Sequence, residues 1–205
     1  MQLNMPATKS NLIGLRKSLA LTKEGYELLD EKRRILLNEL NLVVHQANKV
    51  QHDLEEALQK SYALVDKAVV TQGRIKVEQT SLAVDIKNDI SISSRRLMGV
   101  SIPSIKLQMT DKPPYYSPYQ SNFYIDEAII QFRDVLKMLA QLAEKRITLM
   151  RLAKEVQKTI RKVNALEKVY IPYYTEAVKI ISDRLDEESR EAFSTLKLLK
   201  QIIKS

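Results

Sequence analysis

The chain has 205 residues, a formal net charge of +8, and no cysteine. Without cysteine it can hold neither a disulfide framework nor a thiolate metal site, and the redox compartment stays open. Only 4 Gly and 6 Pro are present, too few turn formers for a globule with many turns, while 28% charged residues suit long solvated helices. No N-terminal signal peptide and no apolar run of the ~20 residues needed to span a bilayer is apparent, so we expect a soluble intracellular protein.

A first long helix is predicted over residues 10–72. Either Ser10 or Asn11 can cap its start, and Gly73 offers a stop. Alternate steps of three and four residues reach an apolar side chain at nearly every position, which is the heptad pattern of a coiled coil. The positions of this seam are Leu12, Leu15, Leu19, Thr22, Tyr26, Leu29, Arg33, Leu36, Leu40, Val43, Ala47, Val50, Leu54, Ala57, Ser61, Leu64 and Ala68.

A second long helix is predicted over residues 122–203, with Ser121 or Asn122 as its cap. The seam continues there from Ile125 to Val163. Pro172 removes one backbone hydrogen bond, so we expect a kink or a short break near it. The positions of this second seam are Ile125, Ala128, Phe132, Val135, Leu139, Leu142, Arg146, Leu149, Ala153, Val156, Ile160 and Val163.

Each apolar seam needs a partner helix, and the nearest partner is the other seam. We therefore predict a mainly α fold, a long antiparallel two-helix coiled coil with a small β-hairpin and loop inserted in the middle, as one elongated domain over residues 1–205. Pairing the helices outward from the middle makes opposed residue numbers sum to roughly 194. Gly25 then lies at the level of Pro172, which favours a bend at that level.

The middle segment, residues 73–121, has a different pattern. Apolar and polar residues alternate from Val84 through Ile92 and resume after Gly99, which predicts a hairpin with its turn between Ser94 and Gly99. Pro103 suits an edge position. The following run, residues 112–119, is rich in proline and tyrosine and predicts a loop that packs tyrosines. An isolated hairpin is marginal in water, so this one should lean on the helices or on another protein.

Catalytic and metal-binding patterns are missing from the sequence. His45 and His52 are the only histidines, lie about 10 Å apart along a helix, and fall outside the seam, so surface histidines are the favoured interpretation. No glycine-rich phosphate loop occurs. Paired carboxylates such as Glu55 and Glu56 lie among basic residues and indicate a solvated face. We expect no cofactor, no metal and no catalysis by this chain.

Positive charge is concentrated in the second helix between Lys145 and Lys162, where the only carboxylate is Glu155. The antiparallel register brings a cluster of the first helix to the Arg161 end, which predicts a positive girdle. An ordinary basic helix face, a nucleic-acid surface without a known docking motif, and a contact with an acidic protein surface all remain open. The girdle residues proposed to bind a partner are Lys32, Arg33, Arg34, Lys154, Lys158, Arg161 and Lys162.

Three stretches, in order along the chain, carry a resemblance to a known family. The first runs from Pro6 to Arg33, and the second is Gly99-Val-Ser-Ile-Pro103 in the middle segment. The third combines Val163–Glu167, Ile171-Pro172 and Leu185–Phe193 with Leu196-Lys197. Together they resemble the D subunit of V-type and archaeal-type rotary ATPases, and the short tail after Leu199 resembles the bacterial or archaeal members.

The resemblance implies a rotor axle without chemistry of its own, cytoplasmic and peripheral to the membrane. Its partners would be the A and B subunits of a catalytic hexamer, the F subunit, and a funnel-shaped rotor subunit above the membrane ring. Neither nucleic-acid binding nor membrane insertion is expected. The girdle would face the hexamer, Val100, Ile102 and Pro103 would make the hairpin contacts, and the tip of the axle would consist of Leu12, Leu15, Leu19, Leu196 and Leu199.

Two other functions fit the same heptads. One is a coiled-coil scaffold or tether without a rotary role, which would not need the three ordered family matches. The other is a basic rod that binds anionic membrane or nucleic acid, with an affinity that collapses as salt is added.

Overall fold

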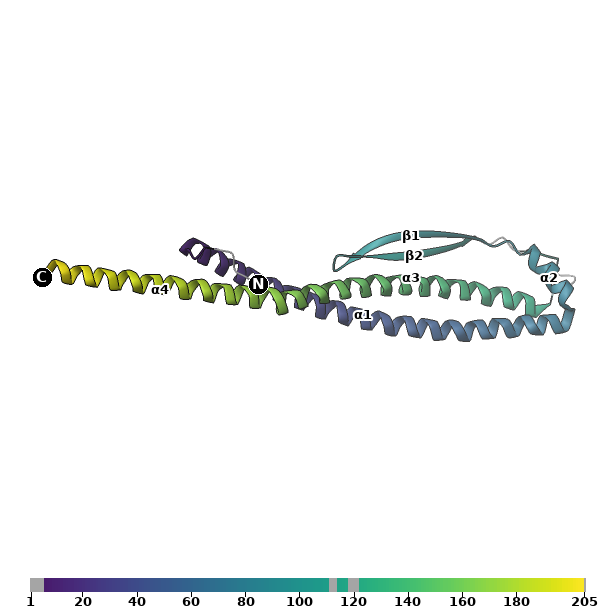
Figure 1. Ribbon diagram of the computed structural model, residues 1–205. Helices are drawn as coiled ribbons and strands as arrows, with labels where there is room; N and C mark the ends of the chain where they lie inside the picture. The colour runs from purple at the N-terminus through teal and green to yellow at the C-terminus, as the bar shows by residue number, and fades with distance from the viewer. Residues whose placement is uncertain (1–5, 111–113, 118–121, 205) are drawn as a thin grey trace. The chain divides into compact units, whose positions relative to one another are not determined.

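The computed structural model describes residues 6–110, 114–117 and 122–204. The chain divides into two compact units, one made of residues 1–35 and 156–205 and the other of residues 36–155. The elements are α1 (Lys9–Gln72), α2 (Arg74–Ala83), β1 (Lys87–Leu97), β2 (Val100–Thr110), α3 (Phe123–Ala165), the π-helical segment η2 (Leu166–Tyr170) and α4 (Ile171–Lys204) (Figure 1). The mainly α class with two long helical stretches and a hairpin between them is confirmed.

Both long helices begin at side-chain caps. The hydroxyl of Thr8 accepts a hydrogen bond from the Asn11 backbone N–H at 3.3 Å, so Thr8 is the cap of α1 in place of the expected Ser10 or Asn11. Asn122 caps α3 by accepting from the Tyr124 N–H at 3.3 Å, as predicted. The alternative cap, Ser121, lies outside the described residues. Gly73 ends α1 with a φ of 85°, a conformation that glycine adopts without strain.

The seam of α1 is confirmed along its whole length. None of its positions from Leu12 to Ala68 is exposed, and Leu36 is fully buried. In the unit of residues 36–155, Leu54 packs with Val135 and Leu142 of α3. In the other unit, Leu15 packs with Ala177 and Ile181 of α4. Both sets of contacts agree with the predicted antiparallel register.

The predicted seam of α3 is wrong in its middle part. Leu139, Arg146 and Ala153 are exposed, whereas Thr148 and Leu152, each one position before a predicted seam residue, are buried. The hairpin, which runs along α3 in Figure 1, covers one part of this region. Glu144 and Arg151 bond to β2, and Thr148 lies on the same face of the helix between them. The buried face of α3 is therefore widened by a second neighbour that the heptads do not report.

The hairpin forms around a two-residue turn, Met98-Gly99, with φ values of 50° and 82°. Positive φ at both central residues defines a type I′ turn, whose twist matches that of the flanking strands. The strands pair in register from Leu97 with Val100 to Lys87 with Thr110. The turn lies within the predicted span from Ser94 to Gly99 but is shorter, because Arg95, Arg96 and Leu97 still pair with β2. Val84 and Ile86 precede the strand, and the helix α2 before them was not predicted.

β2 turns its backbone edge toward α3. Since Leu97 and Val100 flank the turn, Ser101, Pro103 and Ile105 point their backbone groups away from β1. Two of these groups bond to α3: the Ile105 N–H donates to Glu144 Oε2 at 2.8 Å, and the Ser101 carbonyl accepts from Arg151 at 2.8 Å. Pro103 lies between them and has no N–H to satisfy, which confirms the predicted edge position.

Pro172 is accommodated by a wide turn. The Ile171 N–H donates to the Leu166 carbonyl five residues earlier, which makes Leu166–Tyr170 a π-helical turn. Proline removes an N–H and crowds the carbonyl four residues before it, and a wider turn relieves that crowding. The helix then continues as α4. The expected break is thus a π-turn that ends at Tyr170, two residues before the proline.

The tyrosine loop is described only for residues 114–117. Tyr115 accepts a hydrogen bond from Arg133 at 2.9 Å, and Tyr116 donates to Asp126, both on α3. Burial raises the pKa of the Tyr116 phenol well above its usual range, and the bond to Asp126 raises it further. The predicted packing of tyrosines is confirmed for these two residues, while residues 112, 113, 118 and 119 lie outside the described part.

Candidate functional site

Four basic residues of α3 form an exposed stripe. They recur three, four or one position apart, so a single face of the helix carries them. Glu155 and Thr159 lie between them in sequence and Thr159 is buried on the opposite side. None of the four makes an ion pair with another described residue. This basic stripe consists of Lys154, Lys158, Arg161 and Lys162.

The α1 part of the predicted girdle is less cationic than its sequence suggests. Asp30, which is buried, lies 2.5 Å from Arg33 and 3.1 Å from Arg34. Its carboxylate neutralises part of their charge and fixes Arg33, which is half-buried. Lys32 is also half-buried. Sequence reasoning missed Asp30 because it lies one position after the seam residue Leu29. No described contact joins these residues to Arg161.

The three hairpin residues proposed to bind a partner are buried within the chain. Val100, Ile102 and Pro103 lie on β2, the strand next to α3, and Ile102 is only 1% exposed. The face that β1 presents is different, because ten of its eleven residues are exposed, including Ile90 and Ile92. The structure therefore gives the β2 residues a role in seating the hairpin, and β1 is its accessible strand.

The five leucines expected at the axle tip are not brought together. Leu15 is buried, and Leu12 and Leu19 are half-buried. Leu12 and Leu15 belong to the cluster around Ala177 and Ile181. Leu196 and Leu199, in contrast, are 64% and 50% exposed. In Figure 1 the yellow end of α4 continues past the start of α1. We call Asp186–Lys204 the free end of α4, since Leu185 is the last residue shown to be half-buried.

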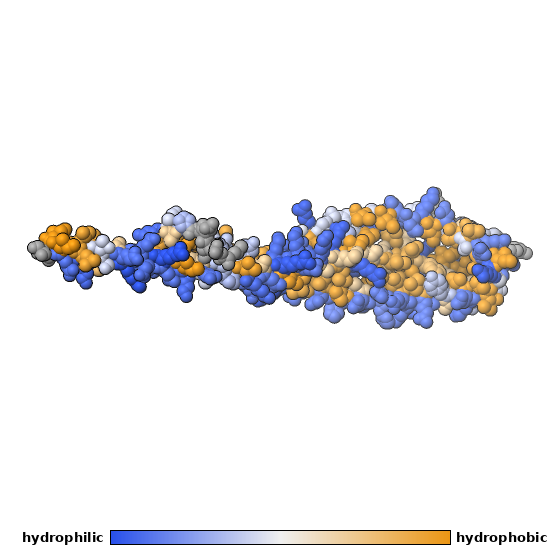
Figure 2. All heavy atoms as spheres, viewed as in Figure 1, coloured by the Kyte–Doolittle hydropathy of each residue, from blue (hydrophilic) through white to orange (hydrophobic). Residues whose placement is uncertain are grey.

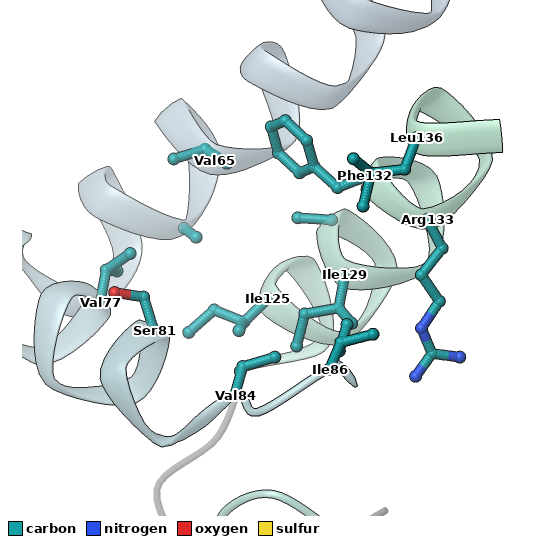
Figure 3. A pocket seen from close by; sticks show the side chains of 12 residues that line it. Val65, Val77, Ser81, Val84, Ile86, Ile125, Ile129, Phe132, Arg133 and Leu136 are labelled. Carbon is teal, nitrogen blue, oxygen red and sulfur yellow. The ribbon is translucent and has the colours of Figure 1, made fainter. Parts of the chain in front are cut away.

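A groove in the unit of residues 36–155 was not predicted (Figure 3). It has a volume of about 310 Å³ and lies between α1, α2 and α3, with Val65, Val77 and Ile125 among its walls and Arg133 at its rim. Its lining is almost entirely apolar. The groove could not be predicted because the helix α2, which forms one of its walls, was not predicted. α2 is short and polar, buries none of its residues and shows no seam.

The two histidines of the sequence both lie on α1. His45 and His52 are both exposed, as predicted, and His52 lies 3.3 Å from Glu56. Across residues 6–110, 114–117 and 122–204, no three His, Asp or Glu side chains are grouped so that they could hold a metal ion. The helices within the same ranges include none long and apolar enough to cross a bilayer.

Comparison with known proteins identifies the family. Residues 11–201 match the family of the ATP synthase D subunit. The V-type ATP synthase D subunit of Thermotoga neapolitana is 33% identical over 199 residues, covering 97% of this chain and 98% of that protein. The A-type ATP synthase D subunit of Thermococcus kodakarensis is 32% identical over 206 residues, covering 99% and 96%. That of Methanosphaera stadtmanae is 33% identical over 199 residues, covering 96% and 93%. This chain belongs to the ATP synthase D-subunit family.

Proposed function

We propose that this chain is the central-stalk rotor axle of a V/A-type rotary ATPase. It transmits torque between a catalytic hexamer of A and B subunits and the membrane ring that translocates ions. It also binds the F subunit and the funnel-shaped rotor subunit above the ring. It works in the cytoplasm at the membrane periphery, uses no cofactor and catalyses no reaction itself.

The observation that carries the proposal is the seam of paired helices in both units. A single helix twists and bends easily, whereas two helices with interlocked side chains resist torsion because each turn is held by its neighbour. Leu54 between Val135 and Leu142, and Leu15 with Ala177 and Ile181, supply such contacts. Torque transmission further requires long unbroken helices, and α1 and α3 each run as one helix.

The surfaces of the helices suit a bearing. A rotating shaft must not be held by deep specific pockets, because each would stall it. The basic stripe offers diffuse charge, and exposed ion pairs contribute only about 0–1 kcal/mol each. Together with Lys32, Arg33 and Arg34 it would face acidic surfaces of the hexamer. The free end of α4 offers apolar side chains to the hexamer cavity (Figure 2, where they gather at the end of α4).

The hairpin is assigned to regulation or to binding of the F subunit. Its β2 residues Val100, Ile102 and Pro103 seat it on α3, and β1 is left open to a partner. The helical seam lies elsewhere, so removing the hairpin should preserve the helix pairs.

Direct observation of rotation tests the proposal. Ser94 is exposed on β1 and the chain has no cysteine, so Ser94→Cys gives a single attachment point for a bead. With the A–B hexamer fixed to a surface, ATP should drive rotation of the bead in steps. A bead that stays bound but never turns would overturn the axle proposal.

A matched control separates rotation from tumbling of a loosely held chain. The same labelled chain, cross-linked chemically to the hexamer, should bind without rotating. Recovery of the chain from native membranes should also bring the A, B and F subunits with it. Recovery of the F subunit without the A and B subunits would place the chain elsewhere in the complex.

A further inference from the structure

We infer that the free chain pairs with a second copy of itself through the free end of α4, as an antiparallel two-helix dimer. Steps of four and three residues along this segment reach a continuing seam that nothing in the described structure covers. Leu196, Leu199 and Ile203 are 64%, 50% and 83% exposed. α1, which covers the preceding part of α4, begins at Lys9. The positions of the uncovered seam are Ser189, Ala192, Leu196, Leu199 and Ile203.

The charge distribution selects the second copy and its direction. Residues 186–191 hold four carboxylates and one arginine, a net charge of −3, while residues 192–203 hold two lysines and no carboxylate, +2. Antiparallel copies place each acidic block against the partner's basic block. Parallel copies would place like charges together. Asp186 and Lys200 are two heptads apart and lie on the same flank of the seam. In an antiparallel pair the same flanks of the two helices meet, so Asp186 of one copy lies near Lys200 of the other.

The small area of the contact predicts a weak association of the two copies. If each of about four apolar side chains per chain buries roughly 100 Å², the dimer covers about 800 Å². That is below the roughly 1,200 Å² where stable interfaces begin, so the pairing should be weak and reversible, in the micromolar range. The same seam is the surface proposed to enter the A–B hexamer. A paired chain is therefore not available for insertion. The dimer must dissociate before the chain can assemble with the hexamer.

Sedimentation of the full chain over a concentration series tests the dimer. Leu196→Glu should shift the dimer midpoint at least tenfold to higher concentration, because it puts a charge in the seam. The matched control is Leu198→Glu, a change of the same residue type on the same helix, 59% exposed and outside the seam. It should dimerise like the parent chain. A parent chain that stays monomeric to about 100 µM, or two variants that behave alike, would overturn the inference.

Cysteine cross-linking tests the direction. An antiparallel pair brings Ala192 of one copy opposite Leu196 of the other, while a parallel pair brings Ala192 opposite Ala192. Oxidising a mixture of Ala192→Cys and Leu196→Cys chains should give mixed disulfides, since these need Cα atoms within about 7 Å. Disulfides between two Ala192→Cys chains alone would refute the antiparallel arrangement. A chain that rotates in the hexamer yet never dimerises would overturn this inference and leave the proposed function standing.

Discussion

Ile102 offers a direct measure of how firmly the hairpin is seated on α3. It is 1% exposed on β2, and Ile102→Ala removes three carbon atoms from that contact. At about 0.8 kcal/mol per buried methylene, plus the cost of the cavity left behind, the change should destabilise the seated hairpin by roughly 2–4 kcal/mol. Ile92 is the matched control, because it lies on the same hairpin and is 71% exposed. Ile92→Ala should cost about 0.5 kcal/mol or less.

Amide hydrogen exchange is the suitable assay, because the hairpin can open without unfolding of the helices. Protection of the β2 amides should fall in Ile102→Ala by a factor of roughly 30–1,000, the equivalent of 2–4 kcal/mol. The Ile105 amide should respond strongly, because it donates to Glu144 only while the hairpin is seated. Helix content by circular dichroism should hardly change. Equal loss in both variants would show that strand propensity, and not the contact with α3, stabilises the hairpin.

Three further changes test other parts of the chain. Gly25→Ala should stabilise α1 by about 0.5–1 kcal/mol in chemical denaturation, because the added methyl meets no atom within 4 Å. A lower stability of the variant would mean that the helix bends at Gly25 and needs a glycine there. Met98→Asn should stabilise the hairpin by roughly 0.5–1 kcal/mol by exchange at Leu97, since asparagine tolerates a φ of 50° better. Reversing all four charges of the basic stripe should weaken assembly with the A–B hexamer at low salt. The effect should be much smaller at about 1 M salt, where charges are screened within about 3 Å. Unchanged assembly at both salts in gel filtration would show that the stripe is only a solvated face.

The helical part of the fold could be predicted because one local rule decides it. Every seam position of α1 avoids exposure, since a single neighbour, its partner helix, lies along it. The rule failed on α3 at Leu139, Arg146 and Ala153, which are exposed, and near Leu152 the hairpin widens the buried face as a second neighbour. Whether a hairpin lies on a helix depends on contacts such as Arg151 with Ser101, fifty residues apart in sequence, which no local pattern reports.

The proposed interaction residues were harder to predict, because burial and ion pairing decide which charged or apolar side chains stay available. The basic stripe was visible as a run of cations and is exposed. Arg33 and Arg34 had the same appearance in sequence, yet they share Asp30. Leu15 and Leu196 both occupy apolar heptad positions, and only the length of the opposing helix separates a core residue from an exposed one.

The open strand β1 has a consequence for the chain before it meets any partner. The sheet has only two strands, so the outer backbone edge of β1 has no strand beside it within the described structure. Such an edge is a template for sheet growth and aggregation. Lys87, Asp89, Arg95 and Arg96 interrupt it with charge, which discourages a second hairpin from adding. Neutralising these charges should raise the fraction of the overexpressed chain that collects in inclusion bodies.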